Sequence, residues 1–152
     1  MNGRMAVIAL AVLLVAAIAA ALFIRSQKQG AGNVSAYQAR ITLEDDQQQN
    51  LTEIDRESSP MIYFRVTLKD VPLGETLALD CDWIAPDGQV AHSNHYETRP
   101  INHDNWNTHC RDGLDPASPT GTWTVAMSLH GRQIAKTTFV LRSGKGAEAK
   151  GK

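Results

Sequence analysis

The densest group of side chains capable of chemistry lies between residues 92 and 109. Four of the five histidines fall in this segment, and with one of its carboxylates they form the group His92, His95, His103, Asp104 and His109. Imidazole and carboxylate are ligands that zinc and copper take in proteins. However, His92 and His95 are three residues apart on an expected strand, so they should point to opposite faces. The segment is therefore either a zinc or copper site built from its four histidines or a set of solvated polar side chains.

No other motif predicts catalysis. A serine nucleophile within G-x-S-x-G is absent from the sequence, as is a glycine-rich phosphate loop. Glu44, Asp45 and Asp46 form a carboxylate run, but it lacks the regular oxygen spacing of a calcium loop. Residues 43–57 are instead expected to form an acidic surface loop. The sequence thus predicts a protein that is not an enzyme and that has no cofactor.

Cys81 and Cys110 are the only two cysteines, and no C-x-x-C motif is present. Redox catalysis and a zinc ribbon are therefore not indicated. The alternatives are one structural disulfide, two free thiols, or two thiolates that bind a metal. A disulfide closing a loop of this length would stabilise the fold by about 3.5 kcal/mol. A disulfide would also require an oxidising compartment. The apolar N-terminal segment described next predicts such a compartment, so the disulfide is favoured over free thiols or metal ligands.

Residues 5–24 form an uninterrupted apolar run of twenty residues, long enough as a helix to cross a bilayer. It could be a signal-anchor helix or a cleaved signal peptide with Ala17-Ile18-Ala19 as the cleavage site. Because the run stays apolar through Ile24, the anchor is favoured. We therefore expect a single-pass protein of the inner (cytoplasmic) membrane, with its C-terminal domain in the periplasm or outside the cell.

Charge and composition divide the rest of the chain. The 15 Lys and Arg residues balance 16 Asp and Glu residues, so no basic excess predicts nucleic-acid binding. The expected organisation is a membrane helix over residues 1–25, a flexible linker over 26–36, a β-sandwich domain over 37–142 and a disordered tail over 143–152.

The predicted domain alternates apolar and polar residues with a period of two, which is typical of half-buried strands. Examples begin at Ala39, Ile62, Leu77 and Trp123, and a weaker, polar strand over 89–96 is expected at an edge. His130-Gly131-Arg132 predicts a hairpin turn before the last strand. The segment from Arg99 to Pro119 is expected to be a long loop with only a short strand around Trp106. Seven or so such strands predict an antiparallel β-sandwich.

Two segments carry a resemblance to a known fold family: Asp82-Trp83-Ile84-Ala85-Pro86-Asp87-Gly88, and Gly121-Thr122-Trp123-Thr124-Val125 followed by a Gly131 turn and Thr138-Phe139-Val140. These residues resemble the immunoglobulin-like modules of bacterial envelope proteins. The resemblance implies an all-β, antiparallel immunoglobulin-like sandwich behind the transmembrane helix. Trp83 lies only two residues after Cys81, unlike the antibody pattern, so the disulfide is expected to join a strand to the long loop.

Tyr96 and Trp106 are aromatic residues in polar surroundings, which often mark protein contacts. They delimit the segment where a partner-binding loop is expected. Together these observations predict a membrane-anchored, outward-facing, non-enzymatic binding or assembly module of a cell-envelope complex, whose partner is a membrane or envelope protein. The alternative is an envelope copper or zinc protein that uses the histidine cluster.

Overall fold

The computed structural model describes residues 33–43, 49–58 and 60–144. The predicted transmembrane helix, most of the predicted linker and the acidic run at residues 44–46 lie outside these ranges. Nearly all of the predicted tail also lies outside them. Among the described residues, no helix is both long enough and apolar enough to cross a membrane.

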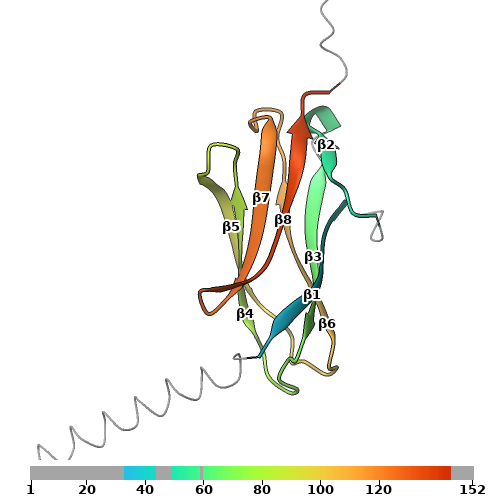
Figure 1. Ribbon diagram of the computed structural model, residues 1–152, viewed down its shortest axis with the longest axis vertical. Coiled ribbons are helices and arrows are strands. Elements are labelled where there is room, and N and C mark those ends of the chain that lie inside the picture. Colours follow the sequence, from blue (N-terminus) through green and yellow to red (C-terminus); the bar gives the residue numbers. More distant parts are fainter. Residues whose placement is uncertain (1–32, 44–48, 59, 145–152) are drawn as a thin grey trace, which may run out of the picture. The chain divides into compact units, whose positions relative to one another are not determined.

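The described residues form eight strands and one short 3-10 helix, η1 (Arg56–Ser58). Figure 1 shows the strands side by side in two layers. They are β1 (Ser35–Leu43), β2 (Glu53–Asp55), β3 (Met61–Lys69), β4 (Ala78–Ile84), β5 (Val90–Glu97), β6 (Trp106–Gly113), β7 (Gly121–Leu129) and β8 (Arg132–Arg142).

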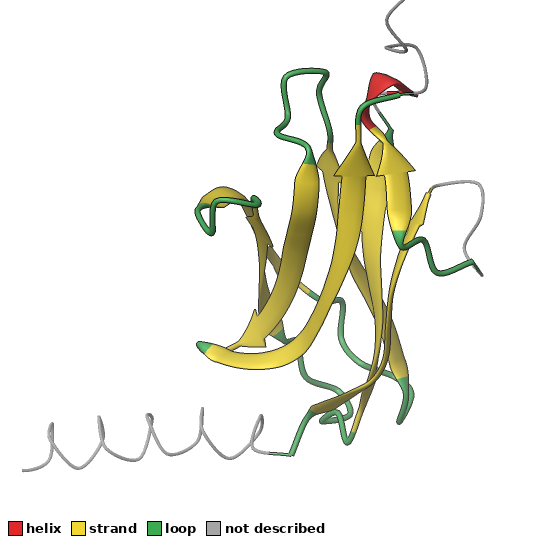
Figure 2. Ribbon diagram, turned by 45° about the horizontal axis from the view of Figure 1, so that its top comes forward, coloured by secondary structure: helices red, strands yellow, loops and turns green. Residues whose placement is uncertain are grey.

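The strands form a three-stranded sheet in the order β1-β3-β6 and a five-stranded sheet in the order β2-β8-β7-β4-β5. All neighbouring strands are antiparallel except β2, which runs parallel to β8. The two sheets face each other, as the turned view in Figure 2 shows. This confirms the predicted all-β sandwich. Its edge strands are β1 and β6 in one sheet and β2 and β5 in the other.

The core follows from the alternation in the sequence. On β3, Ile62, Phe64, Val66 and Leu68 are buried toward the opposite sheet. The facing side chains come mainly from β4, β7 and β8, and the largest of those fully buried are Trp83, Phe139, Leu79, Met127, Leu129 and Leu141. Apolar area removed from water contributes about 25 cal/mol per Å², so these interlocking rows stabilise the sandwich.

The turn between β7 and β8 has the geometry predicted for a two-residue hairpin. His130 and Gly131 lie between the paired residues Leu129 and Arg132, and both have positive φ, at 50° and 75°. Positive φ at both central positions defines a type I′ turn, whose twist matches that of the flanking strands. The predicted turn at this position is confirmed.

The expectation of a long loop over residues 99–119 is wrong in its centre. Strand β6 has eight residues and pairs with β3 along its length, from Leu68 opposite Trp106 to Met61 opposite Gly113. Its core-facing positions include the polar residues Thr108 and Asp112. The sequence of this edge strand therefore lacks the apolar residue at every second position by which a strand is predicted. Because Cys110 lies within this strand, the disulfide does not join a strand to a loop.

The predicted surface loop over residues 43–57 also contains a strand. The three residues of β2 lie beside the end of β8, and Ile54 is buried between exposed Glu53 and Asp55. The hydrogen bond from Val140 N to Thr52 O, at 2.8 Å, extends this pairing. A three-residue strand has only one inward-facing side chain, so its sequence carries no period to recognise.

Candidate functional site

The disulfide between Cys81 and Cys110 joins the two sheets near one edge of the sandwich. Cys81 is on β4 of the five-stranded sheet and Cys110 is on β6 of the three-stranded sheet, with their Cα atoms 6.4 Å apart. Both cysteines are buried. The predicted pairing is confirmed, and it indicates an extracytoplasmic domain because such bridges persist in oxidising compartments.

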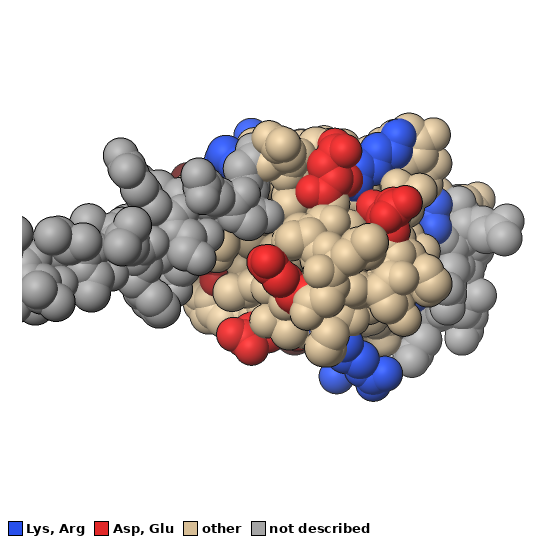
Figure 3. Space-filling view, turned by 90° about the horizontal axis from the view of Figure 1, so that it is seen from below, with Lys and Arg blue, Asp and Glu red and all other residues tan. Residues whose placement is uncertain are grey.

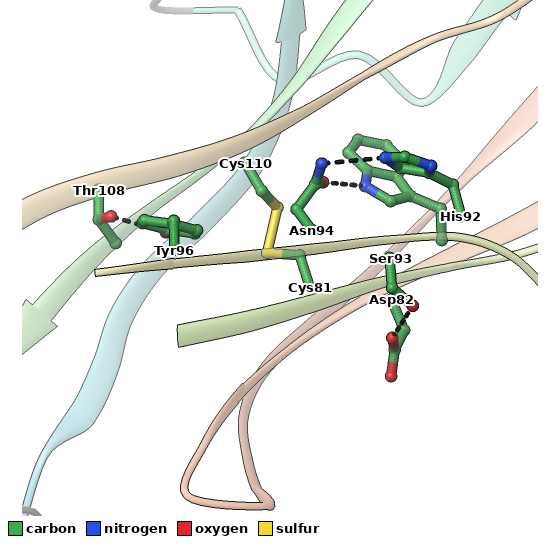
Figure 4. Close-up of a disulfide and its surroundings, with 9 residues drawn as sticks. Cys81, Asp82, His92, Ser93, Asn94, Tyr96, Thr108 and Cys110 are labelled. Atoms are coloured by element: carbon green, nitrogen blue, oxygen red, sulfur yellow. Dashed lines mark hydrogen bonds between the residues drawn. A yellow bond between two sulfur atoms is a disulfide. The ribbon is translucent and has the colours of Figure 1, made fainter. Parts of the chain in front are cut away.

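Polar side chains of β5 lie next to this bridge (Figure 4). The indole Nε1 of Trp83 donates a hydrogen bond to Asn94 Oδ1 at 2.8 Å. The amide nitrogen of Asn94 lies 3.0 Å from His92 Nε2. Since Trp83 is otherwise enclosed by the core, Asn94 provides the acceptor that its buried N–H requires.

The hydroxyl of Tyr96 lies 2.8 Å from Thr108 Oγ1, which links β5 to β6 beyond the disulfide. Burial raises the pKa of Tyr96, and the hydrogen bond to Thr108 partly offsets that increase. At the other side of the bridge, burial also raises the pKa of Asp112, against the opposing effect of nearby His92. The two sheet edges are therefore held together by polar contacts and one covalent bond.

The structure separates the four histidines that were considered as metal ligands. His92 and His95 are on β5, where they lie opposite Trp83 and Asp80 and so face opposite sides of the sheet. His95 Nδ1 lies 2.6 Å from Asp80 Oδ1. His103 is in the β5–β6 loop and His109 is on β6 in the other sheet. In the described ranges, no three His, Cys, Asp or Glu side chains are grouped so that they could hold a metal.

Tyr96 and Trp106 were expected to mark a partner-binding loop. Tyr96 is the penultimate residue of β5, and Trp106 is the first residue of β6. Both are half-buried, and Trp106 lies opposite fully buried Leu68, on the core-facing side of β6. The exposed part of the segment is the intervening loop, which includes Asn102, His103 and Asp104. If this segment contacts a partner, the loop rather than the two aromatic rings presents the accessible surface.

A row of basic side chains crosses the outer face of the three-stranded sheet. Arg40 on β1 lies opposite Arg65 on β3, and Arg65 lies opposite His109 on β6. Directly opposite residues share a face of the sheet, and the alternate residues of β3 are buried in the core. The three basic side chains therefore lie on the outside of the sandwich.

The side chain of Arg65 is held in position by its neighbours. Its Nε donates a hydrogen bond to Thr42 Oγ1 at 2.9 Å. Its guanidinium lies 4.7 Å from the centre of the Tyr63 ring, a favourable cation–π geometry. The Tyr63 ring also lies 5.5 Å from that of His109. These contacts orient Arg65, and its terminal nitrogens have no acceptor among the described residues.

The same basic surroundings act on His109. Burial lowers its pKa, and the positive charges of Arg65 and Arg111 lower the pKa further. All these effects disfavour the imidazolium form of the ring. A negatively charged group nearby would act in the opposite direction and favour protonation.

A pocket of about 130 Å³ lies over this row of side chains. Its wall includes both arginines and His109, together with the polar side chains of Gln38, Thr67 and Asn107. Thr67 Oγ1 lies 2.8 Å from Asn107 Oδ1, so the amide nitrogen of Asn107 remains able to donate elsewhere. The lining carries hydrogen-bond donors from three strands and contains no Asp or Glu.

Sequence reasoning identified the polar face of β3 but not this site. In the sequence, Arg65 is simply one of the polar residues that alternate with the core residues of β3. Arg40 and His109 are 25 and 44 residues away from it in the chain, as their numbering shows, and only the register of the sheet brings them together. Net charge gave no signal because acidic residues elsewhere balance the basic ones. At the end of the domain shown in Figure 3, acidic and basic groups are interspersed with uncharged surface.

Neither protein-family models nor curated proteins match this chain. Solved structures do match it, including an immunoglobulin-like protein, PA1606, from Pseudomonas aeruginosa. That structure has a TM-score of 0.52 and 16% identity, and the match covers 72% of this chain and 97% of the other. The resemblance to immunoglobulin-like proteins is confirmed at the level of the fold.

A second solved structure is the Pseudomonas fluorescens alkylpurine DNA glycosylase AlkC bound to DNA containing an abasic site analog. It has a TM-score of 0.51 and 14% identity, and the match covers 72% of this chain but only 30% of the glycosylase. The chain thus corresponds to less than a third of that enzyme. At these identities, both likenesses concern the fold and carry no function to this chain.

Proposed function

We propose that this chain is a non-enzymatic binding or assembly module of a cell-envelope complex, held in the inner membrane by residues 5–24 and facing outward. The observation that carries the proposal is the Cys81–Cys110 disulfide between the two sheets of an immunoglobulin-like sandwich. A bridge of this kind is useful to a domain outside the cytosol, where it forms and persists.

The sandwich also supports a binding role by its construction. Its strands provide a rigid frame, and the β5–β6 loop (residues 98–105) emerges between two strands that the disulfide and the Tyr96–Thr108 contact hold together. Rigid scaffolds commonly carry recognition on such loops. We therefore assign the partner contact to this loop, and the partner to the proteins of the membrane or envelope.

Site-specific photo-crosslinking in native membranes tests this proposal. A photoreactive residue at Asn102 samples the β5–β6 loop, and one at Thr138 samples the outer face of β8; both positions are exposed. The expected result is one crosslinked product of defined mass from position 102 and none from position 138. The same product should disappear when the chain is overexpressed without its partner.

Absence of any discrete product from position 102, with the chain shown to be folded and in the membrane, would contradict the binding role. Equal products from both positions would show non-specific contact and would contradict it as well. If the chain instead fractionates with soluble cytoplasmic proteins, the anchored and outward-facing part of the proposal fails.

A further inference from the structure

The outer face of the three-stranded sheet combines charge, geometry and unmet hydrogen-bonding capacity in one place. We propose that its pocket is an oxyanion-binding site, in which Arg40, Arg65 and His109 together take a tetrahedral group such as phosphate. The inference depends on the described side chains alone and does not require the binding role proposed above.

The first argument is electrostatic. Arg40 and Arg65 are direct cross-strand neighbours, and like charges in that position destabilise a sheet. In the described ranges, neither arginine forms an ion pair with a carboxylate; the ion pairs there include His95 with Asp80 and Arg142 with Glu53. A bound anion would convert this repulsion into attraction, which accounts for an otherwise unfavourable pair.

The second argument is the state of Arg40 itself. Its Nε is fully buried and has no hydrogen-bond partner among the described residues. A buried donor without a partner carries a desolvation cost and often marks the site of an absent water or ion. Arg40 also lines the pocket, so an anion received there would lie beside a guanidinium whose buried Nε has no partner among the described residues.

The third argument concerns size and donor number. The pocket volume of about 130 Å³ is far above the roughly 10–15 Å³ of such space that a single water molecule needs. A five-atom tetrahedral oxyanion fits this space. Planar guanidinium groups bind phosphate with paired hydrogen bonds, and Asn107 and Gln38 provide further amide donors in the lining.

The phosphoryl group could be free phosphate or part of a lipid headgroup, and two probes separate these sources. Inorganic phosphate and glycerophosphoglycerol, the deacylated headgroup, are titrated separately into the ¹⁵N-labelled full chain in neutral detergent. Chloride at the same ionic strength is the reference. We expect one probe to shift the amide and ring signals around Arg40, Arg65 and His109 saturably, with the stronger probe identifying the source.

Two variants localise the effect. Arg65→Gln and Arg40→Gln should each weaken binding about tenfold or more, because each removes a charge-assisted pair of hydrogen bonds. Lys136→Gln removes one positive charge from an exposed position on β8, in the other sheet, and should leave binding unchanged. Since Arg65 also contacts Tyr63, Arg40→Gln provides a second test that does not depend on that contact.

Stability gives an independent readout. A ligand that binds only the folded state stabilises it according to its concentration and affinity. The effective probe should therefore raise the Tm of the wild-type chain and of Lys136→Gln by similar amounts, and that of Arg40→Gln by clearly less at the same probe concentration. The inference is overturned if neither probe produces shifts beyond those of chloride, or if folded Arg40→Gln and Arg65→Gln bind as tightly as wild type.

Discussion

Removing the Cys81–Cys110 bridge should destabilise the domain by a large and calculable amount. The two cysteines are 29 residues apart in sequence. For a closed loop of that length, the chain-entropy relation gives about 3.6 kcal/mol at 25 °C. Domains of this kind are stable by about 5–15 kcal/mol in total, so the bridge supplies a quarter or more of the free energy of unfolding.

The assay is urea unfolding of the full chain in non-ionic detergent, with tryptophan fluorescence as the measure of unfolding. The wild-type chain is compared in its oxidised form and after reduction in denaturant and refolding under reducing conditions. We expect the free energy of unfolding to fall by about 3.6 kcal/mol and Tm to fall by about 15 °C, at roughly 4 °C per kcal/mol for a domain of this size.

The double variant C81A/C110A is the matched control. Both cysteines are buried, so the variant loses the bridge and also leaves small cavities, and it should be somewhat less stable than the reduced wild-type chain. Its stability should not respond to reductant. Equal stability of the oxidised and reduced wild-type chains, within about 0.5 kcal/mol, would refute the reasoning, because that is the usual range of neutral changes.

Three further predictions concern single residues, each measured by urea unfolding of the full chain against wild type. Asn94→Ala removes the acceptor of the buried Trp83 indole and should cost about 1–3 kcal/mol; a loss below 0.5 kcal/mol would contradict this. Gly131→Ala places a Cβ at a φ of 75° and should cost about 1 kcal/mol, whereas no loss would argue against the type I′ turn. The pKa of His109 is lowered in the folded state. Between that pKa and the unfolded value of about 6.5, the unfolded chain binds more protons than the folded chain. The free energy of unfolding should therefore fall as the pH decreases through this range. His109→Asn should remove that part of the pH dependence, and an unchanged profile would contradict the assigned pKa direction.

The sequence predicted the regular part of the fold because period-two alternation is a local signal. Ile62 to Leu68 and Trp123 to Leu129 place large apolar side chains at every second position, and both segments form strands as expected. Strand β6 was missed because Thr108 and Asp112 occupy core-facing positions near an open edge. Polar residues are tolerated there, since Thr108 is hydrogen-bonded to Tyr96 across the sheets.

The candidate sites depend on which strands pair and in which register, and this cannot be inferred from local sequence patterns. The histidines are close in sequence, yet the strand register places His92, His95 and His109 on different faces and sheets. The opposite applies to Arg40 and Arg65, which are distant in sequence and adjacent in the sheet. Proximity along the chain therefore suggested a metal site, whereas cross-strand pairing produced the oxyanion pocket.

The most direct test of the central claim is the oxidation state and location of the chain in its native cells. Cells are lysed into excess alkylating agent without reductant, membrane and soluble fractions are separated, and the intact chain is weighed by mass spectrometry. The account predicts that the chain is in the membrane fraction, carries no alkyl group and is two mass units lighter than the reduced form. Recovery from the soluble cytoplasmic fraction with Cys81 and Cys110 both alkylated would contradict it.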